Sequence, residues 1–227
     1  MEDCVAGAPD DSMPKIIVLM GAPGAGKGTQ ARLLQERLKL PQISTGDIFR
    51  ALKDSQTPLA VELREIMAQG RLVPDELTIR LVKERTSQDD CRNGYILDGF
   101  PRTPAQAESL ESLAAEQGNE IFPVLIDIPS EILEKRMTGR RNCPVCGEIY
   151  NMYFKPPLHD NVCDVHTDTQ LTHRADDNPE TVTARLTTYE LQTRPLIDYY
   201  NFRGLLRTVD GNRDPEVIYK EIEAIVK

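Results

Sequence analysis

Gly21-Ala22-Pro23-Gly24-Ala25-Gly26-Lys27-Gly28-Thr29 is the stretch that decides the fold of this 227-residue chain. An apolar run over residues 16–20 precedes it, and a helical pattern of apolar residues follows it as far as Leu38. A strand, a glycine loop and a helix start form a phosphate cradle, because backbone N–H groups converge there and the helix start carries partial positive charge. A plain flexible turn, the alternative, needs neither the strand nor the helix. The sequence thus predicts a nucleoside triphosphate held by Gly24, Ala25, Gly26, Lys27, Gly28 and Thr29.

The residue after the lysine departs from the usual form of such loops. That residue is normally Ser or Thr, whose hydroxyl holds Mg²⁺, but here it is Gly28, and Thr29 comes one place later. We therefore expect Mg²⁺ to be held mostly through water and a carboxylate elsewhere in the chain. This favours a phosphotransferase acting on small molecules over a GTPase or a motor.

Composition and charge narrow the class of protein. With 40% hydrophobic residues, the chain can bury one sizeable core. Strand and helix patterns alternate along it, which predicts an α/β fold with a parallel sheet. The net charge of −9 argues against a nucleic-acid partner. Neither a membrane span nor a secretion signal is present, so we expect a cytoplasmic protein. Residues 1–13 are expected to form a disordered tail, with Met13 as an alternative start.

A short segment in the second half of the chain gathers soft metal ligands. They are Cys143, Cys146, Cys163 and His166. Two closely spaced pairs of this kind are typical of a structural zinc site with four protein ligands. Asp164 or His159 could replace His166, which we favour because it completes a pair spaced like the first one. A disulfide is the other alternative, and the missing secretion signal argues against it.

Arginines cluster in the same half of this acidic chain. The clustered residues are Arg136, Arg140, Arg141, Arg174 and Arg185. The planar guanidinium matches phosphate geometry, so the cluster indicates a local anion site. The alternative is a set of solvated helix faces paired with Glu and Asp. It fits Arg80 and Arg85 better than it fits Arg140 and Arg141 beside the cysteines.

Five motifs in register carry a resemblance to a known family. They are the loop at 21–29, Ile43-Ser44-Thr45-Gly46-Asp47, Asp98-Gly99-Phe100-Pro101-Arg102, Arg136 with Gly139-Arg140-Arg141, and Arg174-Ala175-Asp176-Asp177. Together they closely resemble the adenylate kinase family, in its long-lid, zinc-bearing form typical of bacteria. The resemblance covers the chain from Pro14 to Lys227.

The resemblance implies a P-loop core with two insertions. The core would comprise residues 14–43, 74–141 and 174–227, the helical AMP-binding insertion residues 44–73, and the zinc-bearing lid residues 142–173. Sheet strands are expected near Lys15–Met20, Gln42–Ile43, Gly94–Leu97, Phe122–Asp127 and Arg207–Asp210.

The resemblance also implies the reaction ATP + AMP = 2 ADP, with Mg²⁺ and a structural Zn²⁺ as cofactors. The ATP side would comprise residues 24–29 with Arg136 and Arg140. The AMP side would comprise Thr45, Arg50, Gly99, Arg102, Gln106, Arg174 and Arg185. The catalytic residues would be Lys27, Asp98, Arg102, Arg140, Arg174 and Arg185, with Asp98 orienting hydrated Mg²⁺. Asp176 and Asp177, beside Arg174, are expected to orient arginines or to assist lid closure.

Three rival hypotheses remain. A UMP or CMP kinase is disfavoured by Gln106, whose amide suits adenine, and by the long lid. A zinc-knuckle module that uses ATP as a switch would not need the motif at 98–102, and a purely structural protein would not need the arginines. The expected partners are therefore ATP, AMP and ADP, without nucleic acid or membrane, and a monomer is expected.

Overall fold

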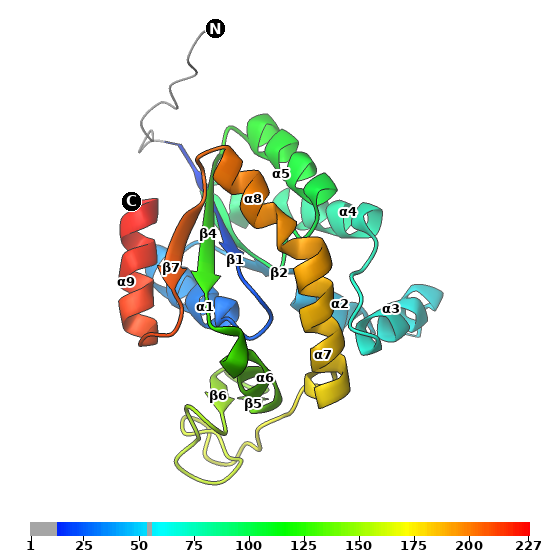
Figure 1. Cartoon of the computed structure of the whole chain (residues 1–227), viewed down its shortest axis with the longest axis vertical. Helices are drawn as coiled ribbons and strands as arrows, with labels where there is room; N and C mark the ends of the chain where they lie inside the picture. The colour runs from blue at the N-terminus through cyan, green and yellow to red at the C-terminus, as the bar shows by residue number, and fades with distance from the viewer. Residues whose placement is uncertain (1–12, 54–55) are drawn as a thin grey trace, which may run out of the picture.

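Figure 1 shows the computed structural model of the chain, which describes residues 13–53 and 56–227. Except for Met13, the expected disordered tail lies outside the described residues. The strands are β1 Lys15–Met20, β2 Gln42–Ser44, β3 Gly94–Asp98, β4 Glu120–Asp127, β5 Arg140–Asn142, β6 Ile149–Asn151 and β7 Arg207–Asp210. The helices are α1 Lys27–Leu38, α2 Thr45–Lys53, α3 Pro58–Ala68, α4 Asp75–Thr86, α5 Pro104–Gln117, α6 Ser130–Thr138, α7 Pro179–Thr188, α8 Pro195–Phe202 and α9 Pro215–Val226. Short helical turns cover Asp89–Cys91, Ala175–Asp177 and Tyr189–Thr193.

A five-stranded parallel sheet forms the centre of the molecule, in the order β2-β3-β1-β4-β7. This confirms the predicted α/β fold, and every predicted strand is present. β4 begins at Glu120, earlier than predicted, because Glu120 pairs with Lys15 of β1. Pro123, which lacks a backbone donor, precedes the part of β4 that pairs with β7. The glycine loop and Asp98 both lie at the carboxyl ends of strands, where such sheets bind ligands.

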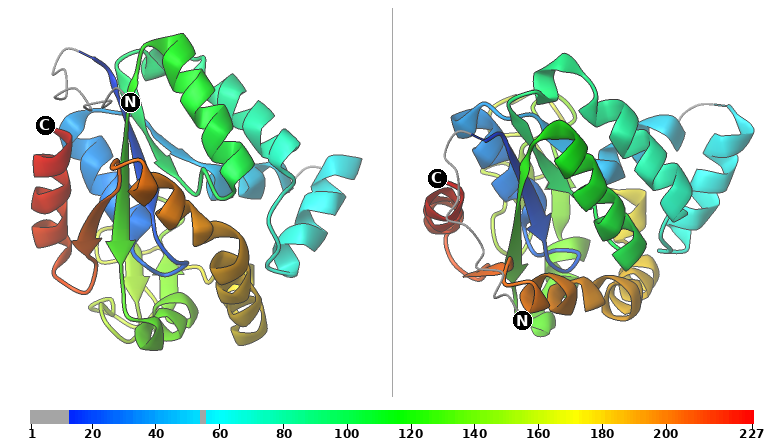
Figure 2. Two further views of the ribbon diagram at one scale, coloured as in Figure 1. Left: turned by 45° about the horizontal axis from the view of Figure 1, so that its top comes forward. Right: turned by 90° about the horizontal axis from the view of Figure 1, so that it is seen from above.

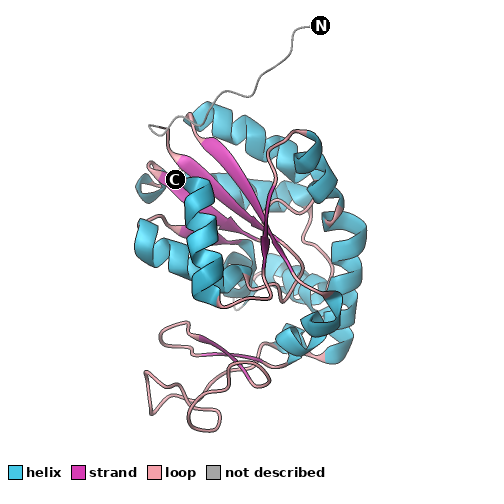
Figure 3. Ribbon diagram, turned by 60° about the vertical axis from the view of Figure 1, so that its left-hand side comes forward, coloured by secondary structure: helices cyan, strands magenta, loops and turns pink. Residues whose placement is uncertain are grey.

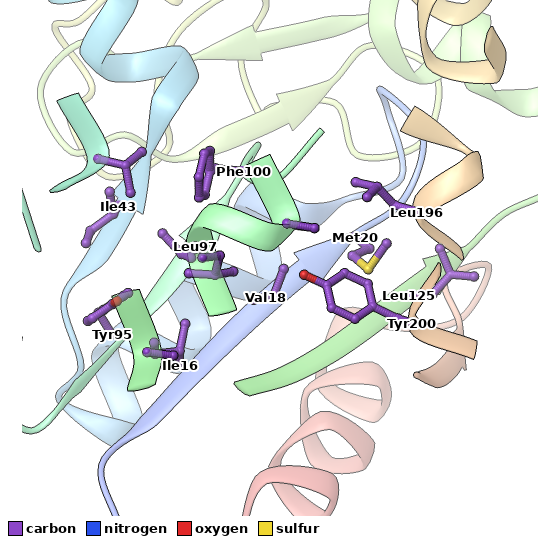
Figure 4. Packing of buried hydrophobic residues seen from close by; sticks show 14 of the residues in the cluster. Ile16, Val18, Met20, Ile43, Tyr95, Leu97, Phe100, Leu125, Leu196 and Tyr200 are labelled. Carbon is purple, nitrogen blue, oxygen red and sulfur yellow. The ribbon is translucent and has the colours of Figure 1, made fainter. Parts of the chain in front are cut away.

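Helices cover both faces of this sheet (Figure 2), so the middle of each inner strand is apolar on both faces. On one face α4, α5 and α8 pack against side chains such as Val18 and Leu97, and Figure 4 shows this layer with Tyr200 of α8. On the other face α1, α6 and α9 pack against Ile17 and Leu19. None of the helices among the described residues has the length and apolar character needed to cross a membrane.

The first predicted insertion, residues 44–73, is helical as expected. Its helices α2 and α3 stand at the side of the sheet, and α3 projects away from it (Figure 2). Phe49 and Leu63 belong to a small hydrophobic cluster of their own. The end of α3 is tied to α7, because the Thr181 hydroxyl donates a hydrogen bond to the Ala68 carbonyl at 3.1 Å.

The second predicted insertion, residues 142–173, lies apart from the sheet and consists mostly of loops (Figure 3). At its start, β5 leads in from the core and pairs with β6 as an antiparallel hairpin. The segments that lead into and out of it are hydrogen-bonded to each other. The N–H of Asn142 donates to the Thr172 carbonyl at 2.9 Å, and the N–H of Thr172 donates back at 2.8 Å. Buried side chains are few here, with Tyr150 and Leu171 packed beside two cysteines.

Candidate active site

The glycine loop turns between β1 and the start of α1. Gly26 has φ +96°, a left-handed conformation that favours glycine. The Lys27 ammonium donates hydrogen bonds to the carbonyl oxygens of Gly21 at 2.8 Å and Ala22 at 2.9 Å. Burial lowers the pKa of Lys27 to about 8, and the negative charge of Asp98 opposes that shift. Anionic phosphate oxygens are stronger acceptors than these carbonyls and can replace them.

Two charged side chains approach this loop from other elements. Arg136 of α6 lies near it, since a Cβ added at Gly26 would lie 4.0 Å from the Arg136 Nη1. A Cβ added at Gly28 would lie 3.6 Å from Oδ2 of Asp98, which ends β3 beside β1. Burial lowers the pKa of Arg136. The structure thus brings the predicted triphosphate residues next to the predicted magnesium-orienting carboxylate.

Gly99 joins several residues predicted for the AMP side. Its carbonyl accepts hydrogen bonds from the Thr45 hydroxyl at 2.8 Å and from Nε of Arg102 at 2.9 Å. Its φ is +83°, and an added Cβ would lie only 2.8 Å from the Thr45 Oγ1, so the position requires glycine. Burial, reinforced by the charge of Arg185, lowers the pKa of Arg102 to about 10.

Gln106 lies in the first turn of α5 and is only 2% exposed. Its Nε2 donates to Oδ1 of Asp75 at 2.7 Å, and its Oε1 accepts from the backbone N–H of Arg102 at 2.8 Å. The side chain of Gln106 therefore does not face solvent, which was the alternative to a binding role for a glutamine on a helix. Arg50, also predicted for the AMP side, forms an ion pair with Asp47 at 2.6 Å.

Asp177 is fully buried and shared between two arginines. Its carboxylate accepts from Nε of Arg140 at 2.8 Å, from Nη2 of Arg140 at 2.6 Å and from Nη1 of Arg185 at 3.0 Å. Asp176 forms an ion pair with Arg185 at 3.0 Å. Burial alone would raise the pKa of Asp176, but Arg185 and the neighbouring arginines outweigh it and lower that pKa. The two aspartates thus hold arginines that reach them from β5 and α7.

Arg174, which stands next to these aspartates in the sequence, is not one of the arginines that they hold. Among residues 13–53 and 56–227, it forms no ion pair with an acidic side chain. Burial lowers its pKa to about 10, and the charges of Arg140 and Arg50 add to the shift. The partners of Asp177 come from separate elements, whereas Arg174 directly precedes the turn that carries both aspartates. Positive charge is concentrated here in a chain of net charge −9, which favours a polyanionic ligand.

The predicted metal ligands also meet in space. Cys143, Cys146, Cys163 and His166 offer ligand atoms that all lie within 4.8 Å of one another. Asp164, the alternative fourth ligand, instead accepts a hydrogen bond from the N–H of Leu158 at 2.7 Å. The cysteines are free thiols. Burial opposes ionisation of Cys163, but donors from His166 and Tyr150 lower its pKa to about 6, which favours the thiolate that a metal binds. The donor set fits a tetrahedral structural Zn²⁺.

A family model described as adenylate kinase matches residues 19–205 of the chain. The chain belongs to the adenylate kinase family. It is 48% identical to the adenylate kinase of Oceanobacillus iheyensis, over 93% of this chain and 98% of that relative. The adenylate kinase of Clostridium perfringens strain 13 is 49% identical over 92% of this chain and 96% of its own length. That of Shouchella clausii is 49% identical over 92% of this chain and 97% of its own length.

These matches confirm the resemblance drawn from the five motifs. They make the chain a phosphotransferase of the adenylate kinase family, whose reaction is ATP + AMP = 2 ADP.

Two residues, Asp75 and Glu148, make contacts that carry no signal in the sequence. Asp75 holds Gln106, but as an acid at a helix start it reads as an ordinary complement to the helix dipole. Glu148, in the turn before β6, contacts Arg32 of α1 and also Lys155. Only the folded chain brings these residues together, since 116 positions separate Arg32 from Glu148.

Proposed function

We propose that the chain transfers the γ-phosphoryl group from ATP in the glycine loop to AMP bound beside Gly99. The observation that supports this best is the cluster of half-buried cations, among which Lys27, Arg102 and Arg174 all have lowered pKa values. The transition state of phosphoryl transfer spreads negative charge over the moving group. Catalysis therefore rests on positioning and on positive charge rather than on covalent chemistry by side chains.

Each cation takes a role that follows from its position. Lys27, the loop amides and Arg136 hold the ATP phosphates, while Arg50 and Arg102 hold the phosphate of AMP. Thr45, Gly99 and Gln106 bind the rest of AMP. Arg140, Arg174 and Arg185 neutralise the charge that develops on the transferring group, as arginine fingers supplied by the chain itself.

Asp98 is the residue we propose to hold Mg²⁺ through its water shell. Its carboxylate faces Gly28, where the loop has no hydroxyl to offer, and lies beside the predicted ATP phosphates. Bound there, the ion would neutralise charge on the phosphates. Asp98 keeps the hydrated ion in place, and Lys27 and Arg136 orient the phosphates toward the acceptor.

Water is the competing acceptor, so the site has to close before the reaction. We propose that residues 142–173 are the lid and residues 44–73 the AMP-binding domain, both working against a core of residues 14–43, 74–141 and 174–227. The chain would act as a monomer in the cytoplasm, on ATP, AMP and ADP, without nucleic acid or membrane.

The reaction is tested by incubating the purified chain with ADP and Mg²⁺ and following the nucleotides by ³¹P NMR. We expect ATP and AMP to appear in equal amounts. Turnover of ATP with UMP or CMP, but none with ADP, would instead indicate a pyrimidine kinase. Transfer to no monophosphate at all would overturn the proposal in favour of a nucleotide-binding module.

Removal of the metal is expected to destabilise the lid, because this segment buries too few apolar side chains to fold without it. Metal analysis should find about one zinc per chain. A strong chelator should lower the melting temperature by about 20 °C or more, since small zinc peptides gain about 10–16 kcal/mol from the metal and each lost kcal/mol costs a chain of this size about 2–4 °C. A metal-free protein with an unchanged melting temperature would contradict this prediction. Cys91→Ser, which alters a free thiol outside the cluster, is the control.

A further inference from the structure

The side-chain amide of Gln106 is fixed from both ends. Asp75 at the start of α4 accepts from its Nε2 at 2.7 Å, and the backbone N–H of Arg102 donates to its Oε1 at 2.8 Å. The second oxygen of Asp75 accepts from the Thr103 hydroxyl at 2.9 Å, so the carboxylate itself cannot rotate without losing a hydrogen bond. All these contacts lie around a side chain that is only 2% exposed.

These contacts allow the amide one orientation. A carboxylate can only accept hydrogen bonds, and a backbone N–H can only donate them. Turning the Gln106 amide over would place its oxygen against the Asp75 carboxylate and its NH₂ group against the N–H of Arg102. Both contacts would be repulsive in a buried site, where unmet polar groups are costly. One N–H and one oxygen lone pair of Gln106 remain for a ligand, in a fixed order.

That order distinguishes two classes of purine. A 6-aminopurine such as adenine presents a ring acceptor, N1, next to a donor, the 6-amino group. A 6-oxopurine such as hypoxanthine presents the reverse, a ring N–H donor next to a carbonyl acceptor. The two bases have nearly the same shape, so a glutamine free to turn over would pair with either.

We propose that Asp75 is the positioning residue that sets the base specificity of the monophosphate site, by locking Gln106 in the orientation that pairs with a 6-aminopurine. The inference rests on the proposed placement of Gln106 at the base of AMP. Asp75 itself touches no reacting group. Without the charge of Asp75, only the N–H of Arg102 still opposes the turned-over amide, so Gln106 accepts IMP more readily.

A purely structural role for Gln106 has to be distinguished from this one. Gln106 lies in the capping turn of α5, where its backbone N–H donates to the Thr103 hydroxyl at 3.3 Å. Loss of a capping contact would change the melting temperature but not the preference among monophosphates. The test therefore compares kcat/KM for AMP with kcat/KM for IMP, using ATP as the donor.

Asp75→Asn keeps the shape of the side chain while removing its charge. We expect the AMP-to-IMP ratio of kcat/KM to fall at least tenfold, mainly through a gain with IMP, while KM for ATP changes less than twofold. The matched control is Glu76→Gln, which makes the same charge change at the next, exposed position of α4 and should leave the ratio unchanged. Thr103→Val frees the second oxygen of Asp75 and should lower the ratio by a smaller factor, which gives an independent check should Asp75→Asn fold poorly.

The outcomes separate this inference from the proposed function. Gln106→Leu should weaken AMP far more than ATP. If it leaves AMP kinetics unchanged, the placement of Gln106 at the base is wrong. If Gln106→Leu weakens AMP but Asp75→Asn and Thr103→Val keep the parent ratio, Asp75 has only a structural role and the inference is overturned.

Discussion

Replacing Arg174 with methionine should lower kcat by about 10³- to 10⁵-fold, the range found for arginines that stabilise phosphoryl transfer. The folded protein should be at least as stable as the parent. Arg174 forms no ion pair with an acid among the described residues, and burial together with Arg140 and Arg50 lowers its pKa to about 10. Burial and the neighbouring arginines thus disfavour its charge in the protein alone, with Asp177 and Asp47 opposing them only in part, and a phosphate would favour it. Steady-state kinetics at saturating ATP and AMP, with a thermal melt, measure both effects.

Arg194→Met is the control for this variant. Arg194 is an exposed arginine that forms an ion pair with Glu190 at 2.6 Å. Removing this exposed pair should change neither kcat nor the melting temperature appreciably. An Arg174→Met variant that keeps kcat within tenfold of the parent would remove Arg174 from the catalytic set. A large loss of stability in that variant would instead show that Arg174 serves mainly to hold the fold.

Among the substitutions, Asp177→Asn should lower the stability of the folded protein the most. The substitution keeps the shape but leaves Arg140 and Arg185, both partly buried, beside each other without the fully buried anion that they share. Breaking a buried ion pair on one side costs about 3–5 kcal/mol, which corresponds to a fall in melting temperature of about 6–20 °C at about 2–4 °C per kcal/mol. The value of kcat should fall as well, since both arginines lose their orientation.

Asp176→Asn provides the comparison, because its carboxylate is partly exposed and, among the described residues, pairs with Arg185 alone. We expect its loss of stability to be less than half of that for Asp177→Asn. Equal melting temperatures for the two variants would show that the shared carboxylate is not the anchor that its geometry indicates.

Much of this fold could be predicted from short-range patterns. The apolar run over residues 16–20, the glycine loop and the helix that follows form one continuous signal, and the structure places β1 and α1 there. The two cysteine pairs are equally local, because close spacing brings each pair together whatever surrounds it. Such signals depend on backbone preferences and on neighbours along the chain, which a sequence displays directly.

The pairing of charges could not be predicted in this way. Which arginines meet Asp177 depends on how β5 and α7 pack around the turn that carries it, and the sequence did not show that they would be Arg140 and Arg185. The same holds for Gln106, whose residue type suggested an adenine contact while its orientation depends on Asp75, 31 positions away. Long-range partners of this kind are chosen by packing, and many arrangements of charges are compatible with one pattern.

The paired segments at Asn142 and Thr172 affect how much conformational entropy the chain loses in each catalytic cycle. A loose flap would have to give up chain entropy every time it covered the nucleotides, at about 1–2 kcal/mol for each residue ordered. Here the chain enters and leaves the proposed lid through two segments that are hydrogen-bonded to each other, and the predicted metal ligands lie beyond that point. The lid has therefore lost its internal freedom once, during folding. Substrate binding then has to restrain only the swing of a single stiff body, which leaves more of the binding energy for holding the two nucleotides in line.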